Sequence, residues 1–352
     1  MEYREYGSSG DVLSIVAFAG IVVSNETSED SERYVSWAID QGINYFDVAP
    51  SYGNAQSMLG PALEPYRKDV FLACKTNKRD AQTAQVELEE SLRLLRTDHF
   101  DLYQLHAMSS EEDLEIATGP GGALEVLLRA RDAGKVRHLG FSAHSAEVAL
   151  ELMNRFAFDS VLFPVNFTTW YESGFGPQIM EEAERRGIYR LALKGAAHHA
   201  LSDRRDRVRE KCWYAPIEDS ELMELALRWT LSQPVTAVIP PGDPELWKMA
   251  VELAQNFKSI NSDEEAKSIT SPSFNRRSMR LIEVKSVNPF KTSRFTLNNS
   301  FIPATGFTPA TTKRINPSAL SSSMKKFPKD WFQSKLLICI AFGSNSTTPS
   351  ME

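Results

Sequence analysis

Four side chains that can move or stabilise protons stand at, or just after, the ends of three apolar segments. Asp47, Lys75 and His106 close the segments INYFDV, VFLACK and DLYQLH, and Tyr52 follows the first of them. If these segments are neighbouring strands of a β/α-barrel, their carboxyl ends meet at one mouth. Each residue also has an ordinary structural explanation. Asp47 fits a loop cap and Tyr52 a half-buried aromatic residue. Lys75 fits a strand end at the surface and His106 a hydrogen-bonded core histidine.

Taken together, the four side chains form a chemically coherent set. A lysine in a barrel mouth needs an opposite charge, and Asp47 is the candidate partner of Lys75. A neighbouring ammonium favours the phenolate, so we expect a pKa of Tyr52 below its ordinary value of about 10. Tyr52 would then release its proton more readily to a developing alkoxide, while His106 orients the carbonyl oxygen.

The set lacks one reagent. The sequence shows no nucleophile beside a base and no metal-ligand spacing, so we expect no metal site. Reduction of a carbonyl group still needs a hydride, which no side chain supplies and a nicotinamide cofactor does. The residues therefore predict hydride transfer to a carbonyl compound.

The elements that must position these residues alternate along the chain. Short apolar runs, mostly without a polar alternation, are typical of strands buried on both faces of a parallel sheet. We expect eight of them, at residues 14–21, 43–48, 70–75, 101–106, 136–142, 160–166, 188–194 and 235–240. Amphipathic helices are expected between them, at residues 27–38, 81–96, 122–134, 145–156, 176–187, 219–233 and 243–257. This order predicts an α/β protein with a (β/α)8 TIM barrel over residues 1–260, opened by a small hairpin in residues 1–11.

Composition limits the partners. Residues 1–261 hold 26 basic and 40 acidic residues, and an acidic body argues against nucleic acid as a partner. The three cysteines are far apart, and the N-terminus is polar, which favours a reducing, cytoplasmic location. No apolar run reaches the roughly 20 residues of a membrane span. The oligomeric state cannot be read from the sequence.

The remaining segment, residues 261–352, is of another kind. Its residues 262–352 hold 13 basic and 6 acidic residues, with many Ser, Thr, Asn and Pro and no helical or strand period. We expect a disordered extension, with residues 331–343 as an alternative site of partner docking. A structural role through this tail is a third hypothesis for the protein.

The motifs resemble those of the aldo-keto reductase superfamily over about residues 1–258. The similarity lies in GINYFDVAPSYGNAQSMLGPAL (42–63), VFLACKTNKRD (70–80), DHFDLYQLH (98–106) and GKVRHLGFSAHS (134–145). It implies a catalytic tetrad of Asp47, Tyr52, Lys75 and His106, and reduction of an aldehyde or ketone by NAD(P)H.

The resemblance also implies cofactor contacts, and it favours NADP(H) over NAD(H). The residues at matching positions are Gly20, Ser142, His144, Asn166, Lys194, Pro241, Gly242 and Asp243. Alanine stands at positions 17, 19 and 143, where relatives carry Gly or Asn. These departures keep open a second hypothesis, a cofactor-binding sensor or partner subunit with little turnover.

The substrate is a small carbonyl compound whose identity the sequence does not disclose. Three long loops are candidates for its selection, at residues 107–121, 167–176 and 195–218. Trp213 and Tyr214 in the last loop are expected to wall the substrate pocket. The alternative is that this loop, with His198 and His199, is simply solvated.

Overall fold

The architecture comes from a computed structural model that describes residues 1–261 apart from Ser8, Ser173 and Ser202. Residues 262–352 lie outside this part of the chain. The expectations for the C-terminal extension therefore remain predictions.

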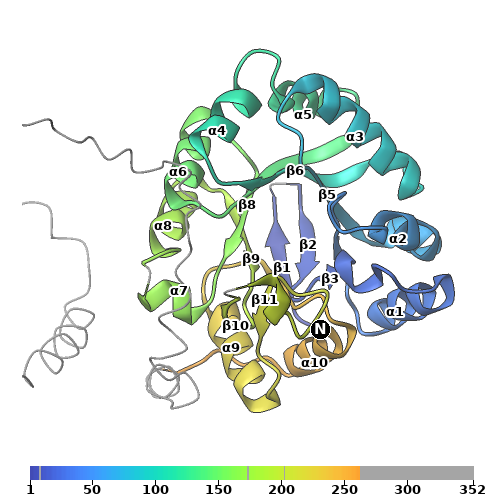
Figure 1. Cartoon of the computed structure of the whole chain (residues 1–352), viewed down its shortest axis with the longest axis vertical. Coiled ribbons are helices and arrows are strands. Elements are labelled where there is room, and N and C mark those ends of the chain that lie inside the picture. Colours follow the sequence, from blue (N-terminus) through green and yellow to red (C-terminus); the bar gives the residue numbers. More distant parts are fainter. Residues whose placement is uncertain (8, 173, 202, 262–352) are drawn as a thin grey trace, which may run out of the picture. The chain divides into compact units, whose positions relative to one another are not determined.

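Eight parallel strands form a barrel, as the sequence predicts (Figure 1). Hydrogen bonds join them in the order of the chain: β3 (Phe18–Ala19), β4 (Tyr45–Asp47), β5 (Phe71–Thr76), β6 (Phe100–Met108), β7 (Val136–Ala143), β8 (Ser160–Pro164), β9 (Tyr189–Leu193) and β12 (Ala237–Ile239). The first and last strands meet at a parallel bridge between Val16 and Val238. There Ala17 N donates to Val238 O at 3.0 Å and Val238 N donates to Ile15 O at 2.8 Å, which closes the sheet.

Helices surround the barrel and pack their apolar faces on the outer face of the strands. The predicted ones are α1 (Ser28–Asp40), α3 (Ala81–Leu94), α5 (Ala123–Asp132), α6 (Ala146–Arg155), α8 (Pro177–Arg186), α9 (Ser220–Ser232) and α10 (Pro244–Ala254). Side-chain caps hold several of their first turns, because an oxygen there satisfies free backbone N–H groups. Ser145, Asp219 and Asp243 accept such bonds from Val148 N, Leu222 N and Leu246 N.

Three helices were not expected from the sequence: α2 (Ala55–Leu63), α4 (Glu111–Thr118) and α7 (Phe167–Glu172). They are short, so no helical period develops, and α2 contains Gly60 and Pro61. Gly60 has a packing reason, since a Cβ there would lie 2.1 Å from Leu94 O at the end of α3. Three 3-10 turns complete the helical elements: η1 (Gly20–Val23), η2 (Glu64–Asp69) and η3 (Arg204–Asp206).

The predicted N-terminal hairpin is present as β1 (Tyr3–Tyr6) and β2 (Asp11–Ser14). It closes the end of the barrel opposite the strand carboxyl ends. Tyr6 is fully buried there, and its hydroxyl donates to Ser160 Oγ at 2.8 Å. The hairpin thus supplies Tyr6 and Leu13 to the apolar interior of the barrel, together with Tyr45, Phe71, Leu102, Leu162 and Leu191.

A second hairpin lies in the predicted loop after β9. Strands β10 (Ala197–Ala200) and β11 (Tyr214–Pro216) pair antiparallel, with a register shift between Ala197 and His199. Figure 1 shows this hairpin over the mouth of the barrel. Residues 203–213, which lie between the two strands, are called the strap below.

Candidate active site

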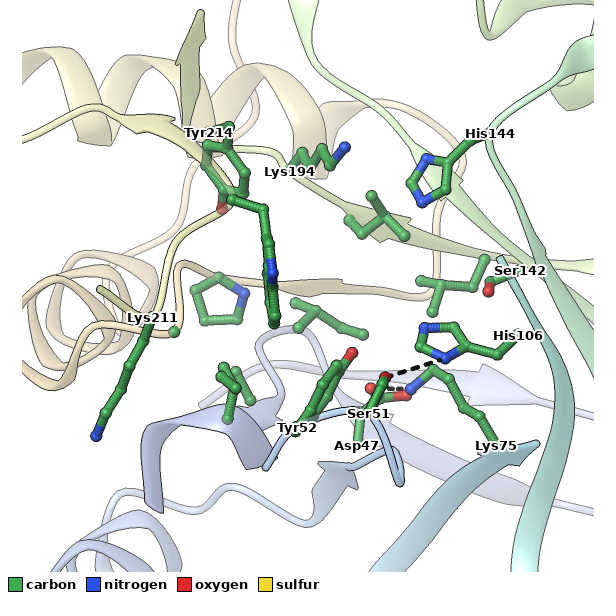
Figure 2. Close-up of a pocket in the computed structure, with 18 residues that line it drawn as sticks. Asp47, Ser51, Tyr52, Lys75, His106, Ser142, His144, Lys194, Lys211 and Tyr214 are labelled. Carbon is green, nitrogen blue, oxygen red and sulfur yellow. Dashed lines mark hydrogen bonds and ion pairs between the residues drawn. The ribbon is translucent and has the colours of Figure 1, made fainter. Parts of the chain in front are cut away.

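A cavity of about 300 Å³ opens at the carboxyl ends of the strands, where β/α-barrels place their functional groups. The strand ends supply part of its lining and the strap and β11 supply another part (Figure 2). All four members of the predicted tetrad line it: Asp47, Tyr52, Lys75 and His106. The structure therefore brings the four residues together.

Asp47 and Lys75 form an ion pair at the floor of the cavity. Both side chains are 1% exposed, and Lys75 Nζ donates to Asp47 Oδ1. Tyr45 Oη also donates to Asp47, at 3.4 Å from Oδ2. Burial raises the pKa of Asp47, and the ammonium of Lys75 opposes that rise.

Gly20 packs closely against the end of β4, next to the ion pair, and does not line the cavity. A Cβ at Gly20 would lie 2.8 Å from both Asp47 O and Val48 Cβ. The glycine thus lets η1 approach the end of β4 closely. This packing requirement accounts for Gly20 without the cofactor contact that the sequence predicts.

Tyr52 stands in the loop after β4, above the ion pair. The Lys75 ammonium lies 5.7 Å from the centre of its ring, and the His106 ring centre lies 6.1 Å away. Burial, reinforced by the Asp47 carboxylate, raises the pKa of Tyr52 above its ordinary value. The expectation of a lowered pKa is therefore wrong in this structure, because burial of the phenol, followed by the nearby Asp47 carboxylate, disfavours the phenolate.

His106 lies near the C-terminal end of β6, and its side chain lines the cavity. Its Nδ1 lies 2.7 Å from Asn77 Oδ1 and 3.5 Å from Ser51 Oγ. Arg79 donates to the backbone oxygen of His106 at 2.8 Å. Burial, together with the charge of Lys75, holds the pKa of His106 well below its usual range, so the imidazole is neutral.

Four of the predicted cofactor residues line the cavity, namely Ser142, His144, Lys194 and Gly242. Ser142 Oγ accepts from Ala107 N at 2.7 Å, which leaves the hydroxyl proton free to donate. The other four do not line it: Gly20, Asn166, Pro241 and Asp243.

Two of the residues outside the lining are helix caps. Asn166 Oδ1 accepts from Thr169 N at 2.9 Å in the first turn of α7. Asp243 caps α10 and lies 3.4 Å from the guanidinium of Arg209. Each of the two residues therefore has a structural role as a helix cap, and neither lines the cavity.

The predicted substrate residues, Trp213 and Tyr214, do line the cavity. The ring centres of Trp213 and Tyr52 are 5.7 Å apart, and Trp213 is 50% exposed. Tyr214 begins β11, where burial raises the pKa of its phenol. The unexpected hairpin is thus what carries both aromatic side chains to the site.

Sequence reasoning also missed polar residues in and around the site, among them Asn77, Arg209 and Lys211. Asn77 follows Lys75 by two positions, a spacing that could have suggested a contact with the strand-end groups. Arg209 and Lys211 lie in the strap, and their placement depends on its path. Lys211 Nζ donates to Val22 O at 2.6 Å and pairs with Glu26.

Within residues 1–261, apart from the three positions left out, no cluster of His, Cys, Asp or Glu could hold a metal ion. The helices of the same region are all too short or too polar to cross a bilayer.

Comparison with known proteins places these features in a family. The profile of the Aldo/keto reductase family matches residues 23–271. Aldo-keto reductase YhdN of Bacillus subtilis (strain 168) is 34% identical over 166 residues, covering 42% of this chain and 48% of YhdN. The chain thus matches about half the length of that relative. Uncharacterized oxidoreductase YqkF of the same organism is 23% identical over 306 residues, covering 77% of this chain and 96% of YqkF.

A solved structure supports the fold. Aldo-keto reductase AKR11C1 from Bacillus halodurans, in its holo form, superposes with a TM-score of 0.60 at 20% identity. The match covers 76% of this chain and 95% of that chain. The family profile extends over more than half of the chain, and the barrel is the one that the motifs predict. The chain therefore belongs to the aldo/keto reductase family of oxidoreductases.

Proposed function

We propose that this protein reduces an aldehyde or ketone to an alcohol with a nicotinamide cofactor, and that Tyr52 donates the proton. One observation carries the proposal: Asp47, Tyr52, Lys75 and His106 come from the ends of three neighbouring strands and line one cavity. The volume of about 300 Å³ suits the reacting end of a cofactor together with a small carbonyl compound.

The protonation states suit reduction. The raised pKa keeps Tyr52 protonated at neutral pH, so the phenol is a proton donor in the resting site. As the carbonyl oxygen gains negative charge, the phenol proton moves to it. Lys75, held by Asp47, then lies close enough to stabilise the phenolate that forms.

His106 orients the carbonyl oxygen as a neutral imidazole. A neutral histidine carries one ring proton, and the partner of Nδ1 decides which nitrogen holds it. As placed, Asn77 Oδ1 accepts from Nδ1, so the proton lies on Nδ1; turning the Asn77 amide so that its NH2 group faces Nδ1 moves the proton to Nε2, from which it can be donated to the substrate. Asn77 is therefore a positioning residue for His106.

The residues of the cavity fit a nicotinamide. The walls include apolar side chains that suit a flat ring: Ala19, Leu162, Leu193 and Ile239. The free hydroxyl proton of Ser142 suits a carboxamide. When bound, the nicotinamide supplies the hydride that no side chain provides.

We propose NADP(H) over NAD(H) as the cofactor. The strap carries Arg209 to Asp243 at the start of α10, one of the positions where the resemblance implies a cofactor contact. Three carboxylates already contact Arg209, those of Glu218, Asp243 and Glu245, and Glu245 is 80% exposed and free to turn away. Dissociation constants measured for NADPH and NADH by fluorescence quenching decide the point. Equal or tighter binding of NADH would contradict the NADP(H) proposal.

The catalytic proposal is tested by absorbance at the reduced nicotinamide band with a panel of small aldehydes and ketones. Wild type is expected to consume cofactor, and Tyr52→Phe to lose at least about a hundredfold in kcat. The substitution removes one hydroxyl and keeps the ring contact with Trp213. Equal rates for wild type and Tyr52→Phe would remove Tyr52 from the reaction.

A second candidate is a sensor or partner subunit that binds the cofactor with little turnover. Ala19 favours it, since its side chain lines the cavity where a glycine would leave room. Tight cofactor binding without turnover on the panel, together with turnover after Ala19→Gly, would select this candidate.

A further inference from the structure

Lys194 is placed in the cavity by an unusual backbone conformation. It follows Leu193, the last residue of β9, and its φ is 62°. Within the described part of the chain, only three other residues besides glycines have a positive φ: Asn25, Arg96 and Ala107. A lysine rarely adopts this region, so the turn is imposed by its surroundings and directs the side chain to the site.

The ammonium of Lys194 has no acidic partner among the residues that the structure describes. The two other lysines of the cavity are each paired, Lys75 with Asp47 and Lys211 with Glu26. The Lys194 ammonium lies over the face of the Tyr214 ring, with Nζ 6.0 Å from its centre. Burial lowers the pKa of Lys194, which reflects the cost of holding a charge away from water.

His144 faces the same part of the cavity. Figure 2 shows the Lys194 side chain extending toward the His144 ring, on the side of the cavity away from Asp47 and Lys75. Burial, together with the Lys194 charge, lowers the pKa of His144 to about 3. The ring is therefore neutral, and one of its nitrogens can donate a hydrogen bond. The structure gives this ring no hydrogen-bond partner within residues 1–261.

A cation and a neutral donor that share one end of a cavity suit a negatively charged oxygen group. We propose that Lys194 and His144 form an anion subsite, which binds a carboxylate of the substrate or a phosphate of the cofactor. The identity of that ligand rests on the proposed carbonyl reduction, but the subsite itself does not. A substrate that reached both ends would carry its carbonyl group at Tyr52 and its carboxylate at Lys194.

The subsite is tested first by equilibrium binding, without turnover. Titration calorimetry of the full chain at low ionic strength uses succinate and inorganic pyrophosphate as probes. Wild type is expected to bind at least one of them, and Lys194→Met to weaken that binding by roughly tenfold or more. Lys135→Met, which removes a surface lysine paired with Glu89, is the matched control and is expected to bind as wild type does.

Two further arms distinguish the source of the anion. A weaker affinity of Lys194→Met for NADPH, measured by fluorescence quenching, assigns the subsite to the cofactor. A KM for succinate semialdehyde that rises more than the KM for butanal in Lys194→Met assigns it to a substrate carboxylate. If no variant shows catalysis, the calorimetric binding experiment still decides whether the subsite exists.

The backbone at position 194 requires a second variant, because methionine tolerates a positive φ poorly. Lys194→Asn keeps a residue that adopts this conformation readily and removes the charge. Circular dichroism establishes that both variants are folded. If folded Lys194→Asn binds succinate, pyrophosphate and NADPH within twofold of wild type, with unchanged KM values, the anion subsite is refuted.

Discussion

Asp47 and Lys75 are tolerated inside the barrel because each neutralises the other. Both are 1% exposed, so removing one leaves the other as an uncompensated buried charge. We expect Lys75→Met to lower the free energy of unfolding by about 3 to 5 kcal/mol, measured by urea denaturation.

The double variant Asp47→Asn/Lys75→Met tests whether the instability of each single variant comes from the unpaired charge or from the altered packing. It removes both charges, so most of the lost stability is expected to return although activity stays absent. If the double variant were as unstable as the sum of the two single ones, the side chains would act independently and the pairing argument would fail.

Residue chemistry was the most predictable part of the site. The strand-end positions of Asp47, Lys75 and His106 are enough to place them together, because parallel strands of a barrel end at one rim. The pKa of Tyr52 was not predictable in the same way. It depends on how strongly Asp47 cancels the ammonium and how deeply the phenol is buried, and both depend on distances.

The strap is held at both flanks of the mouth by charged side chains. Arg209 bonds to Glu218 at 2.7 Å and Glu245 at 2.9 Å, and Lys211 bonds to Val22 O. We expect Arg209→Met to release this segment locally while the barrel stays folded, because its ion pairs to Glu218, Asp243 and Glu245 are lost. Limited trypsin digestion should then cut within residues 203–213 several times faster than in wild type.

Lys135→Met again serves as the control for the loss of one tryptic site and one surface charge. An unchanged rate of cleavage in the strap of Arg209→Met would show that the ion pairs do not restrain it.

Strands and helices were predictable where they are long enough for the sequence to show a hydrophobic pattern. All eight strands and the helices of ten or more residues follow from apolar runs, caps and terminal glycines. The helices α2, α4 and α7 and the β10–β11 hairpin did not follow. Each is short, and the hairpin is bent by a register shift, so its residues show no alternation before the fold arranges them.

At the scale of the whole molecule, the closed end of the barrel depends on charge. His138 lies 2.9 Å from Asp11 of the hairpin and 3.9 Å from Asp159 before β8. Burial disfavours its charge, but both carboxylates outweigh that effect, so the pKa of His138 is raised. The carboxyl groups keep lowered pKa values, and Arg137, Arg131, Tyr6 and Ser9 also face this cluster.

The raised pKa of His138 in the folded state fixes the direction in which its contribution to stability changes with pH. The contribution of His138 to stability is complete below its unfolded pKa of about 6.5 and is lost as the pH rises through the folded value. We therefore expect His138→Gln to lower the free energy of unfolding more at pH 5.5 than at pH 8.5. Urea denaturation at both pH values tests it, and an equal loss at both would mean that the charge is not involved.

The bridge between Val16 and Val238 has a consequence for how the chain reaches its native state. Neighbouring strands elsewhere in the barrel are joined by one intervening segment, but this seam brings together the two extremes of the sheet. Trp247 strengthens it by donating to Ala17 O, 230 positions away. Such distant contacts carry the largest loop-closure cost, so the seam is expected to form last. Until it does, β3 and β12 are open sheet edges that can pair with another chain, and a slow closure would favour aggregation during refolding.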